Sequence, residues 1–166
     1  SSARAGKITT DHGVIETPIF MPVGTVGTVK GVHQRELKEE INPDIILGNT
    51  YHLYLRPGIE TLEKAGGLHK FMKWENPILT DSGGFQAFSL SNLAEVNNNG
   101  IIFRSHIDGT KHLFTPEKAY EYQKRLGSDI IMCLDHCVAS ETSKTKLETA
   151  VDRTSEWAQI TRNAHS

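Results

Sequence analysis

The 166-residue sequence predicts an α/β protein built around a parallel sheet with crossover helices. Short apolar runs at residues 44–47, 78–79 and 129–134 have the composition of buried strands, and segments with helix signals separate them. Polar residues follow each run closely, as is usual where parallel strands end at a binding cleft. We therefore expect the chemistry to lie at the carboxyl ends of these strands.

Turn and cap residues divide the first half of the chain. The predicted elements are a hairpin over residues 1–17, a buried strand at 19–23, a Gly-rich loop at 24–31, a helix at about 33–41, the strand at 44–47 and a helix at about 58–65. Asp11-His12-Gly13 supplies the hairpin turn, and Gly66-Gly67 stops the second helix. The loop at 24–31 lacks the spacing of a P-loop or dinucleotide motif, so a substrate-side loop and a plain connector both stay open.

The segment at 68–74 is predicted to be a connector between a helix and the central strand. It contains the apolar residues Leu68, Phe71, Met72 and Trp74. Connectors normally lie on the surface, so an apolar cluster there predicts a partner surface. The alternative is that the cluster folds down over the helices.

The second half of the chain has equally clear signals. The predicted elements are the strand at 78–79, a helix at about 87–96, a hairpin that pairs 101–104 with 112–114, a helix from 115 to about 126, the strand at 129–134 and a helix at about 143–165. Asp108-Gly109 supplies the second hairpin turn, and Thr115-Pro116 reads as an N-cap followed by a first-turn proline. The last helix presents one apolar face that includes Leu147, Ala150, Val151, Thr154, Trp157, Ala158 and Thr161.

Composition narrows the class of protein. The formal net charge of −2 gives no sign of the excess of basic residues that is typical of nucleic-acid-binding proteins. No apolar run approaches the length of a membrane span and no export leader is visible, so a cytoplasmic protein without a membrane partner is expected. Two cysteines make no disulfide framework. Histidines such as His52, His69 and His106 are expected to be structural hydrogen-bonding groups, and Cys137 a small buried hydrophobe.

The central strand ends in an unusual sequence, Asp81-Ser82-Gly83-Gly84-Phe85. Strand interiors reject Asp and paired glycines, so the strand stops here and delivers Asp81 into a cleft. Gly83 and Gly84 let a ligand approach the backbone, and Phe85 offers a flat ring. A plain turn-capping role for Asp81 is the alternative.

Three polar residues, Asn49, Asp81 and Asp135, follow different strands, so a parallel sheet makes them neighbours. Two carboxylates at the same end of the sheet suit general acid/base catalysis, because their different environments can separate their pKa values. They also suit a ligand edge that is rich in N–H donors, since an ionised carboxylate only accepts hydrogen bonds.

Several strings resemble the queuine tRNA-ribosyltransferase family, the tRNA-guanine transglycosylases. They are Phe20-Met21-Pro22-Val23-Gly24-Thr25, Leu47-Gly48-Asn49-Thr50-Tyr51-His52-Leu53, Leu55-Arg56-Pro57-Gly58, Gly67-Leu68-His69, residues 79–86 and Ser105-His106-Ile107-Asp108-Gly109. The resemblance implies a (β/α)8 barrel with insertions. It also implies a glycosyltransferase of queuosine biosynthesis that exchanges guanine at the tRNA wobble position for a 7-deazaguanine base, queuine or its precursor.

The resemblance also assigns roles to individual residues. Asp81 matches the general acid/base, and Ser82, Gly83, Gly84 and Phe85 match the rest of the base-binding segment, with Phe85 stacking on the purine. Asp135 matches a carboxylate that reads the base, and Asn49 a polar residue near the ribose. After Asp135, bacterial members usually continue Glu-Cys-Thr-Pro, whereas this chain has His136-Cys137-Val138-Ala139. That departure leaves the choice between queuine and its precursor open.

Other parts of the family pattern are absent from this sequence. Nothing matches the aspartate nucleophile or the zinc site of three cysteines and a histidine, since Cys133 and Cys137 do not supply it. Residues 1–166 are therefore expected to be the N-terminal portion of a single catalytic barrel whose full-length form binds structural zinc and tRNA and forms a homodimer or heterodimer. A non-catalytic accessory subunit of the same fold and an unrelated barrel enzyme for small purines are the alternatives.

Overall fold

The computed structural model describes residues 2–90 and 94–165. Its centre is a four-stranded parallel sheet of β3 (Val23–Gly24), β4 (Ile46–Gly48), β5 (Ile78–Thr80) and β9 (Ile130–Ile131), which are neighbours in that order. Each connection carries at least one helix, so the predicted parallel sheet with crossover helices is confirmed.

Helices fill the first two connections of the sheet. They are α1 (Gln34–Glu36), which continues as the π-helical turn η1 (Leu37–Ile41), then α2 (Thr50–Leu55), α3 (Ile59–Lys64) and α4 (Leu68–Met72). The predicted helices at about 33–41 and 58–65 are confirmed. Helix α2 was not predicted from the sequence. It starts directly after β4, where Asn49 caps it by accepting a hydrogen bond from the His52 N–H.

The third connection holds the largest insertion. It consists of α5 (Gly84–Ser89), an antiparallel sheet of β6 (Glu95–Asn97), β7 (Gly100–Arg104) and β8 (Lys111–Phe114), and α6 (Pro116–Leu126). The hairpin of β7 with β8 and the capped helix α6 are confirmed. The prediction of a helix at 87–96 was wrong in its bounds: α5 begins at Gly84, and Val96 pairs with Ile101 in the sheet. Residues 91–93 of that prediction lie outside the described residues.

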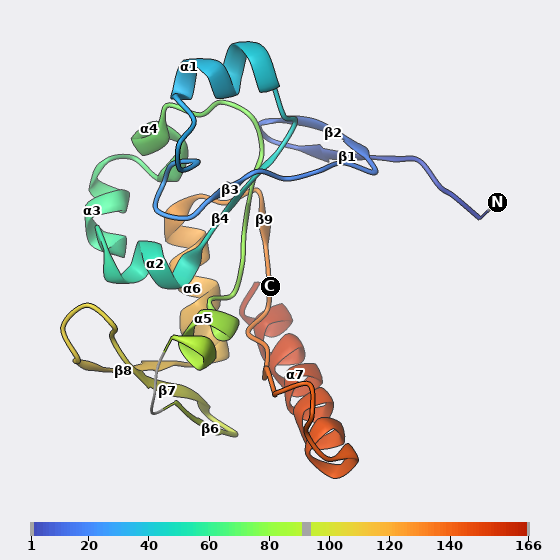
Figure 1. Cartoon of the computed structure of the whole chain (residues 1–166), viewed down its shortest axis with the longest axis vertical. Coiled ribbons are helices and arrows are strands. Elements are labelled where there is room, and N and C mark those ends of the chain that lie inside the picture. Colours follow the sequence, from blue (N-terminus) through green and yellow to red (C-terminus); the bar gives the residue numbers. More distant parts are fainter. Residues whose placement is uncertain (1, 91–93, 166) are drawn as a thin grey trace.

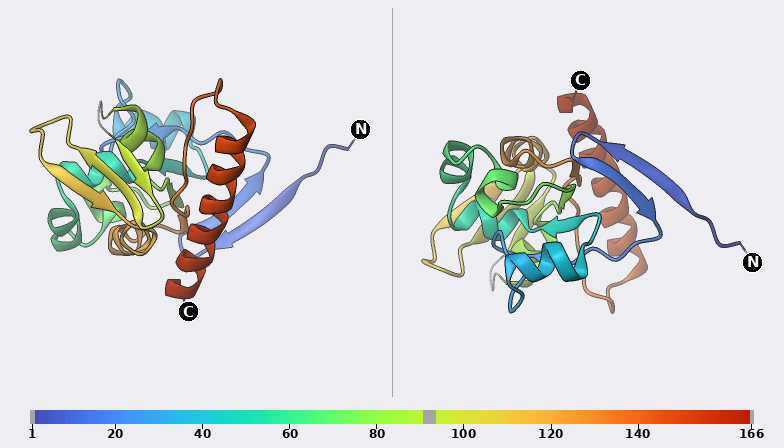
Figure 2. Two further views of the ribbon diagram at one scale, coloured as in Figure 1. Left: turned by 90° about the horizontal axis from the view of Figure 1, so that it is seen from below. Right: turned by 90° about the horizontal axis from the view of Figure 1, so that it is seen from above.

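Figure 1 shows how these parts surround the parallel sheet. The hairpin of β1 (Gly6–Thr10) with β2 (Gly13–Thr17) lies with α1 at the amino ends of the strands, and α5 with the sheet of β6, β7 and β8 lies at the carboxyl ends. The final helix α7 (Lys144–His165) runs beside the carboxyl ends, as Figure 2 also shows. The predicted N-terminal hairpin and C-terminal helix are thus confirmed.

One face of the parallel sheet is well covered and the other is not. Ile46 pairs with Ile78, and both are completely buried in a cluster with residues of α2, α3, α4 and α6. The next row, which includes Leu47 and Leu79, points to the opposite face because side chains alternate along a strand, and these two residues are only half-buried. In the same row Val23 is 49% exposed.

Two predictions about burial were wrong. Residues 19–23 form no buried strand: only Val23 enters β3, which lies at the sheet's edge with a single described neighbour, and Phe20 is 79% exposed. The cluster at 68–74 is not a surface connector either: most of it folds inward, as the alternative held. Leu68 and Met72 lie on the same side of α4, one turn apart, and are buried with Trp74, so only Phe71 remains exposed, at 42%.

Only some residues of the apolar face predicted for the last helix are buried. Trp157, Ala150 and Thr161 are buried, which confirms the core role of Trp157. Leu147 and Val151 are exposed, since α7 contacts the rest of the chain mainly through α6. Among the described residues, no helix combines the length and apolar character needed to cross a bilayer.

Candidate active site

The polar residues predicted at the strand ends do meet. Asn49 and Asp81 directly follow β4 and β5, and the Asn49 Nδ2 group donates a hydrogen bond to Asp81 Oδ2 at 2.6 Å. Asp135 lies four residues beyond β9, and the Ser82 hydroxyl donates to its Oδ1 at 2.6 Å. The sheet therefore brings Asn49, Asp81, Ser82 and Asp135 together, as their sequence positions predicted.

Asp81 is held by the start of α2. The Thr50 N–H donates to Asp81 Oδ1 at 2.9 Å, and the Thr50 hydroxyl donates to the Asp81 carbonyl at 2.6 Å. Thr50 is completely buried, so both bonds are shielded from water. Sequence reasoning missed Thr50 as a functional neighbour, although it follows Asn49 immediately.

The surroundings of Asp81 change its acidity. The pKa of the Asp81 carboxyl is raised from 3.8 to about 6, mainly by burial and also by the negative charge of Asp135, against the lowering effect of hydrogen bonds such as that from Thr50. A carboxyl with a pKa near 6 can both give and accept a proton close to neutral pH, which general acid/base catalysis requires.

The two glycines after Ser82 are required by close contacts. Gly83 has φ +78°, and a Cβ there would lie 3.0 Å from the Tyr51 nitrogen. A Cβ on Gly84 would lie 2.8 Å from both the backbone oxygen and Oδ1 of Asp135. Only glycine therefore lets the segment approach Asp135 this closely. The following residue, Phe85, is 58% exposed and can offer its ring to a ligand.

Asp135 has a donor on each of its oxygens. Ser82 donates to Oδ1, and the Cys137 thiol donates to Oδ2 at 2.8 Å. Burial raises the pKa of the Cys137 thiol to about 12, and the bond to Asp135 adds to the effect, so the thiol stays protonated. Cys137 is thus a polar partner of Asp135 and only half-buried, rather than the small buried hydrophobe that was predicted, and it is not an activated nucleophile.

Two histidines, His12 and His69, lie close together at the opposite end of the sheet. His12 Nδ1 lies 2.7 Å from Asp129 Oδ1, and His69 Nε2 lies 3.2 Å from Asp129 Oδ2. The two rings stack with their centroids 3.6 Å apart and their planes at 13°. A metal ion lies near the plane of each imidazole that binds it, and one ion cannot lie in two parallel planes at this separation. These residues are therefore a hydrogen-bonded anchor for the N-terminal hairpin.

The zinc site implied by the resemblance does not fit the described residues. His12, His69 and Asp129 are the described group with potential metal ligands in reach of one another, and this group contains no cysteine. Cys137 is engaged with Asp135. His69 also contacts the Asn76 carbonyl, and Tyr51 contacts His106, which confirms the structural roles predicted for these two histidines; for His52 the structure shows ring contacts with Tyr51 and His106.

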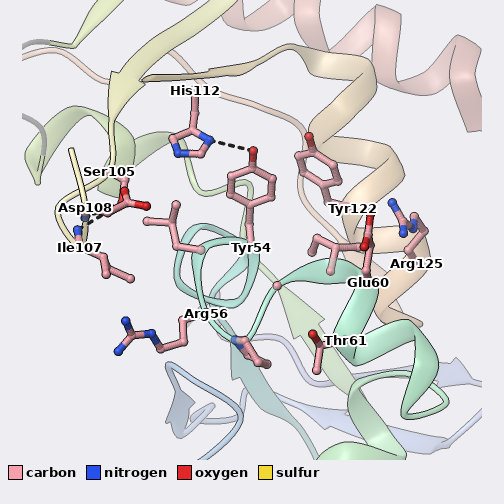
Figure 3. Close-up of a pocket in the computed structure, with 14 residues that line it drawn as sticks. Tyr54, Arg56, Glu60, Thr61, Ser105, Ile107, Asp108, His112, Tyr122 and Arg125 are labelled. Carbon is pink, nitrogen blue, oxygen red and sulfur yellow. Dashed lines mark hydrogen bonds between the residues drawn. The ribbon is translucent and has the colours of Figure 1, made fainter. Parts of the chain in front are cut away.

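A hollow of about 530 Å³ lies away from Asp81. It is bounded by α2, α3, α6 and the loop between β7 and β8, where Tyr54 bonds to His112 beside Tyr122 (Figure 3). Its Arg125 already pairs with Glu63 at 2.7 Å, and its Asp108 accepts hydrogen bonds from Thr110. Because these groups satisfy one another, the carboxylates at the strand ends remain the better candidate for chemistry.

The fold and the site define an α/β protein with two carboxylates at the carboxyl ends of parallel strands, one of which has its pKa raised to about 6. The sequence profile of the family described as Queuine tRNA-ribosyltransferase matches residues 1–166. The chain belongs to this family.

Individual members of the family are highly similar to the chain. A queuine tRNA-ribosyltransferase from Desulforapulum autotrophicum is 60% identical over 163 residues, which cover 98% of the chain and 44% of the relative. Those from Lawsonia intracellularis and Caldanaerobacter subterraneus are 56% and 57% identical over 99% of the chain, and again 44% of each relative is covered. The chain thus spans less than half the length of these relatives.

Proposed function

We propose that the chain is the N-terminal portion of a transglycosylase that exchanges guanine in tRNA for a 7-deazaguanine base, queuine or its precursor. The observation that carries this proposal is the placement of Asp81 and Asp135 at one end of the sheet, with the pKa of Asp81 raised to about 6. The name of the relatives, queuine tRNA-ribosyltransferase, supports the same reaction.

In this reaction Asp81 acts as the general acid/base. It gives a proton to the departing purine and takes one from the incoming base. Its pKa near 6 suits both steps, since the neutral and ionised forms lie close in free energy at neutral pH. The resemblance places the aspartate nucleophile in a later strand of the longer protein, so the covalent step belongs to residues beyond this chain.

Asp135 reads the base. Guanine presents an N1–H and an exocyclic amine, and each oxygen of an ionised carboxylate can accept a further hydrogen bond besides those from Ser82 and Cys137. The exposed ring of Phe85 stacks on the purine once the base has left the helix stack. Asn49 uses its Oδ1 as the cap and one N–H as the donor to Asp81, so its contact with the ribose uses the second N–H of its amide.

The rest of the protein closes a (β/α)8 barrel on this half. Strands β3, β4, β5 and β9 are neighbours in sequence order without a reversal, as in a barrel and unlike a doubly wound sheet. The incompletely covered face, with Leu47, Leu79 and Val23, becomes the inside of that barrel. The structural zinc belongs to the missing part.

The full-length protein acts on tRNA in the cytoplasm and forms a dimer. Phe71 is the exposed aromatic residue on α4, where it covers Gly27 and remains 42% accessible. An exposed ring on a helix whose other apolar residues, Leu68 and Met72, are buried is a suitable contact for a second subunit.

Incorporation of labelled guanine into tRNA by the full-length protein tests the proposal. We expect turnover in the wild type and a loss of about a hundredfold or more in the variant Asp81→Asn, because an amide cannot transfer the proton. Near-native exchange by that variant would overturn the role of Asp81. A wild type that binds tRNA without any exchange would favour the second candidate, a non-catalytic accessory subunit.

A further inference from the structure

Asp135 lies on a segment with no strand partner. Strand β9 ends at Ile131, and residues 132–139 form no regular secondary structure. A carboxylate that selects a base by hydrogen bonds must be held within a fraction of an ångström, and a free backbone does not provide this. Contacts from other elements must therefore hold the segment.

One contact holds the segment before Asp135. Gln123, completely buried on α6, accepts a hydrogen bond from the Met132 N–H at 2.9 Å and donates to the Met132 carbonyl at 2.8 Å. The side-chain amide thus replaces a neighbouring strand for one residue. It acts on Met132, three residues before the carboxylate.

Helix α7 holds the segment directly after Asp135. The His136 N–H donates to the Thr154 hydroxyl at 3.0 Å, and Arg153 Nη1 lies 3.0 Å from His136 Nδ1. The Arg153 guanidinium is fixed in turn, since its Nε and Nη2 donate to Asn98 Oδ1 at 3.3 and 2.9 Å. The turn that carries Asn98 is bound to α7 a second time, through the bond from Trp157 Nε1 to the Asn98 carbonyl at 3.0 Å.

The contact between Arg153 and His136 requires one protonation state. A guanidinium is always a donor, so His136 Nδ1 must accept, and the imidazole is neutral with its proton on Nε2. Burial lowers the pKa of His136 and the charge of Arg153 lowers it further, whereas Asp135, the other charged group that acts on it, raises it. A protonated His136 would place two donors and two positive charges 3.0 Å apart, which would break the contact.

The segment has room to move once the contact is broken. A hollow of about 320 Å³ is lined by Asp135, His136 and Val138 on this segment and by residues of α7 such as Val151. A displacement into this hollow would carry Asp135 away from Ser82 without unfolding the sheet.

From these contacts we infer that Arg153 is a positioning residue which, through neutral His136, holds Asp135 in the orientation that reads the base. The inference rests on the proposed function, because it gives Asp135 the role of base recognition. The hydrogen bonds of Arg153 go to His136 and Asn98 rather than to Asp81. Its loss therefore weakens binding of the base and leaves proton transfer intact.

The test measures KM and kcat for labelled guanine in tRNA exchange, with the full-length protein, from about pH 5.5 to about pH 8. Arg153→Met removes the guanidinium and keeps the apolar stem. We expect a rise in KM of about tenfold at the upper pH with kcat within about twofold, the signature of lost binding common to ground and transition state. Lys146→Met, an exposed cation removed from the same helix, is the control and should leave both constants unchanged.

A second variant separates positioning from general stability. In His136→Asn the amide oxygen can take the place of Nδ1 as the acceptor for Arg153, and it does not titrate. We expect this variant to keep the wild-type KM at the upper pH and to lose the rise in KM that acid causes in the wild type. If Arg153→Met does not fold, the KM of His136→Asn at low pH tests the inference without it.

The possible results are distinct. An unchanged KM in a folded Arg153→Met would overturn the inference. So would a rise in KM at low pH in His136→Asn that equals the rise in the wild type. No exchange by the wild type, or a wild-type KM in Asp135→Asn, would instead contradict the proposed function itself.

Discussion

The raised pKa of Asp81 predicts a dependence of stability on pH. The folded protein holds the Asp81 carboxyl at a pKa of about 6, against 3.8 for the free group. Between these values the folded state keeps a proton that the unfolded state has lost, so the free energy of unfolding falls as the pH rises. A shift of this size corresponds to about 3 kcal/mol, which is fully lost once the pH exceeds about 6.

The substitution Asp81→Asn removes this loss, because the amide is neutral at every pH. An amide also has only one acceptor for the two donors, Asn49 Nδ2 and the Thr50 N–H, which adds a destabilisation of about 1 kcal/mol at every pH. We therefore expect the variant to be slightly less stable than the wild type near pH 4 and more stable by about 2 kcal/mol above pH 7.

Urea unfolding of the full-length wild type and Asp81→Asn at a series of pH values measures this difference. The decisive quantity is its change with pH, since the lost hydrogen bond contributes a constant. Asp152→Asn, an exposed carboxylate of α7, is the matched control and should show no such trend. A difference between wild type and Asp81→Asn that stays constant from pH 4 to pH 8 would refute the assignment of a buried, proton-holding Asp81.

Four further predictions concern other parts of the site and fold. Asp135→Asn places a donor where the base needs an acceptor, so calorimetry should show weaker binding of the free 7-deazaguanine ligand by about 1–3 kcal/mol; an unchanged affinity would exclude the base-reading role. Phe71→Glu should turn the proposed dimer of the full-length protein into a monomer in analytical ultracentrifugation, while Lys70→Glu on the same helix should not; a dimer of normal strength would count against this contact. Gln123→Leu leaves both polar backbone groups of Met132 unpaired, so the free energy of unfolding should fall by about 2 kcal/mol or more; a loss below about 0.5 kcal/mol would disprove that Gln123 holds Met132 in place. Residues 1–166 alone should incorporate no labelled guanine into tRNA, because the nucleophile lies elsewhere; measurable turnover, free of full-length contaminant by mass spectrometry, would contradict the division of roles.

Local signals predicted much of the fold. Thr115 and Pro116 fixed the start of α6 and Gly127 its end, since caps act within a few residues. Asp81 and Asn49 were located because a buried run must stop where a carboxylate or an amide appears. These features depend on neighbours in sequence, which is why they can be read without a structure.

Other features depended on contacts between distant residues. The helical nature of 68–72 was missed, and the sequence left its burial as one of two alternatives, because Leu68 and Met72 meet their partners only after α3 and α6 pack nearby. The strand Glu95–Asn97 follows from pairing with β7 rather than from its own composition. Nothing in the sequence around Gln123 showed that its side-chain amide would bond to the backbone of Met132 in place of a neighbouring strand.

The sequence by itself determined which residues are the candidates for the chemistry: Asp81 after a short apolar run, paired glycines behind it, and Asp135 beyond another run. Only the tertiary structure decided how these groups behave. The pKa of Asp81 follows from its burial and from the charge of Asp135, and the orientation of Asp135 follows from donors on Ser82 and Cys137. Desolvation and hydrogen-bond geometry arise only when segments far apart in the chain come together, so no local pattern can encode them.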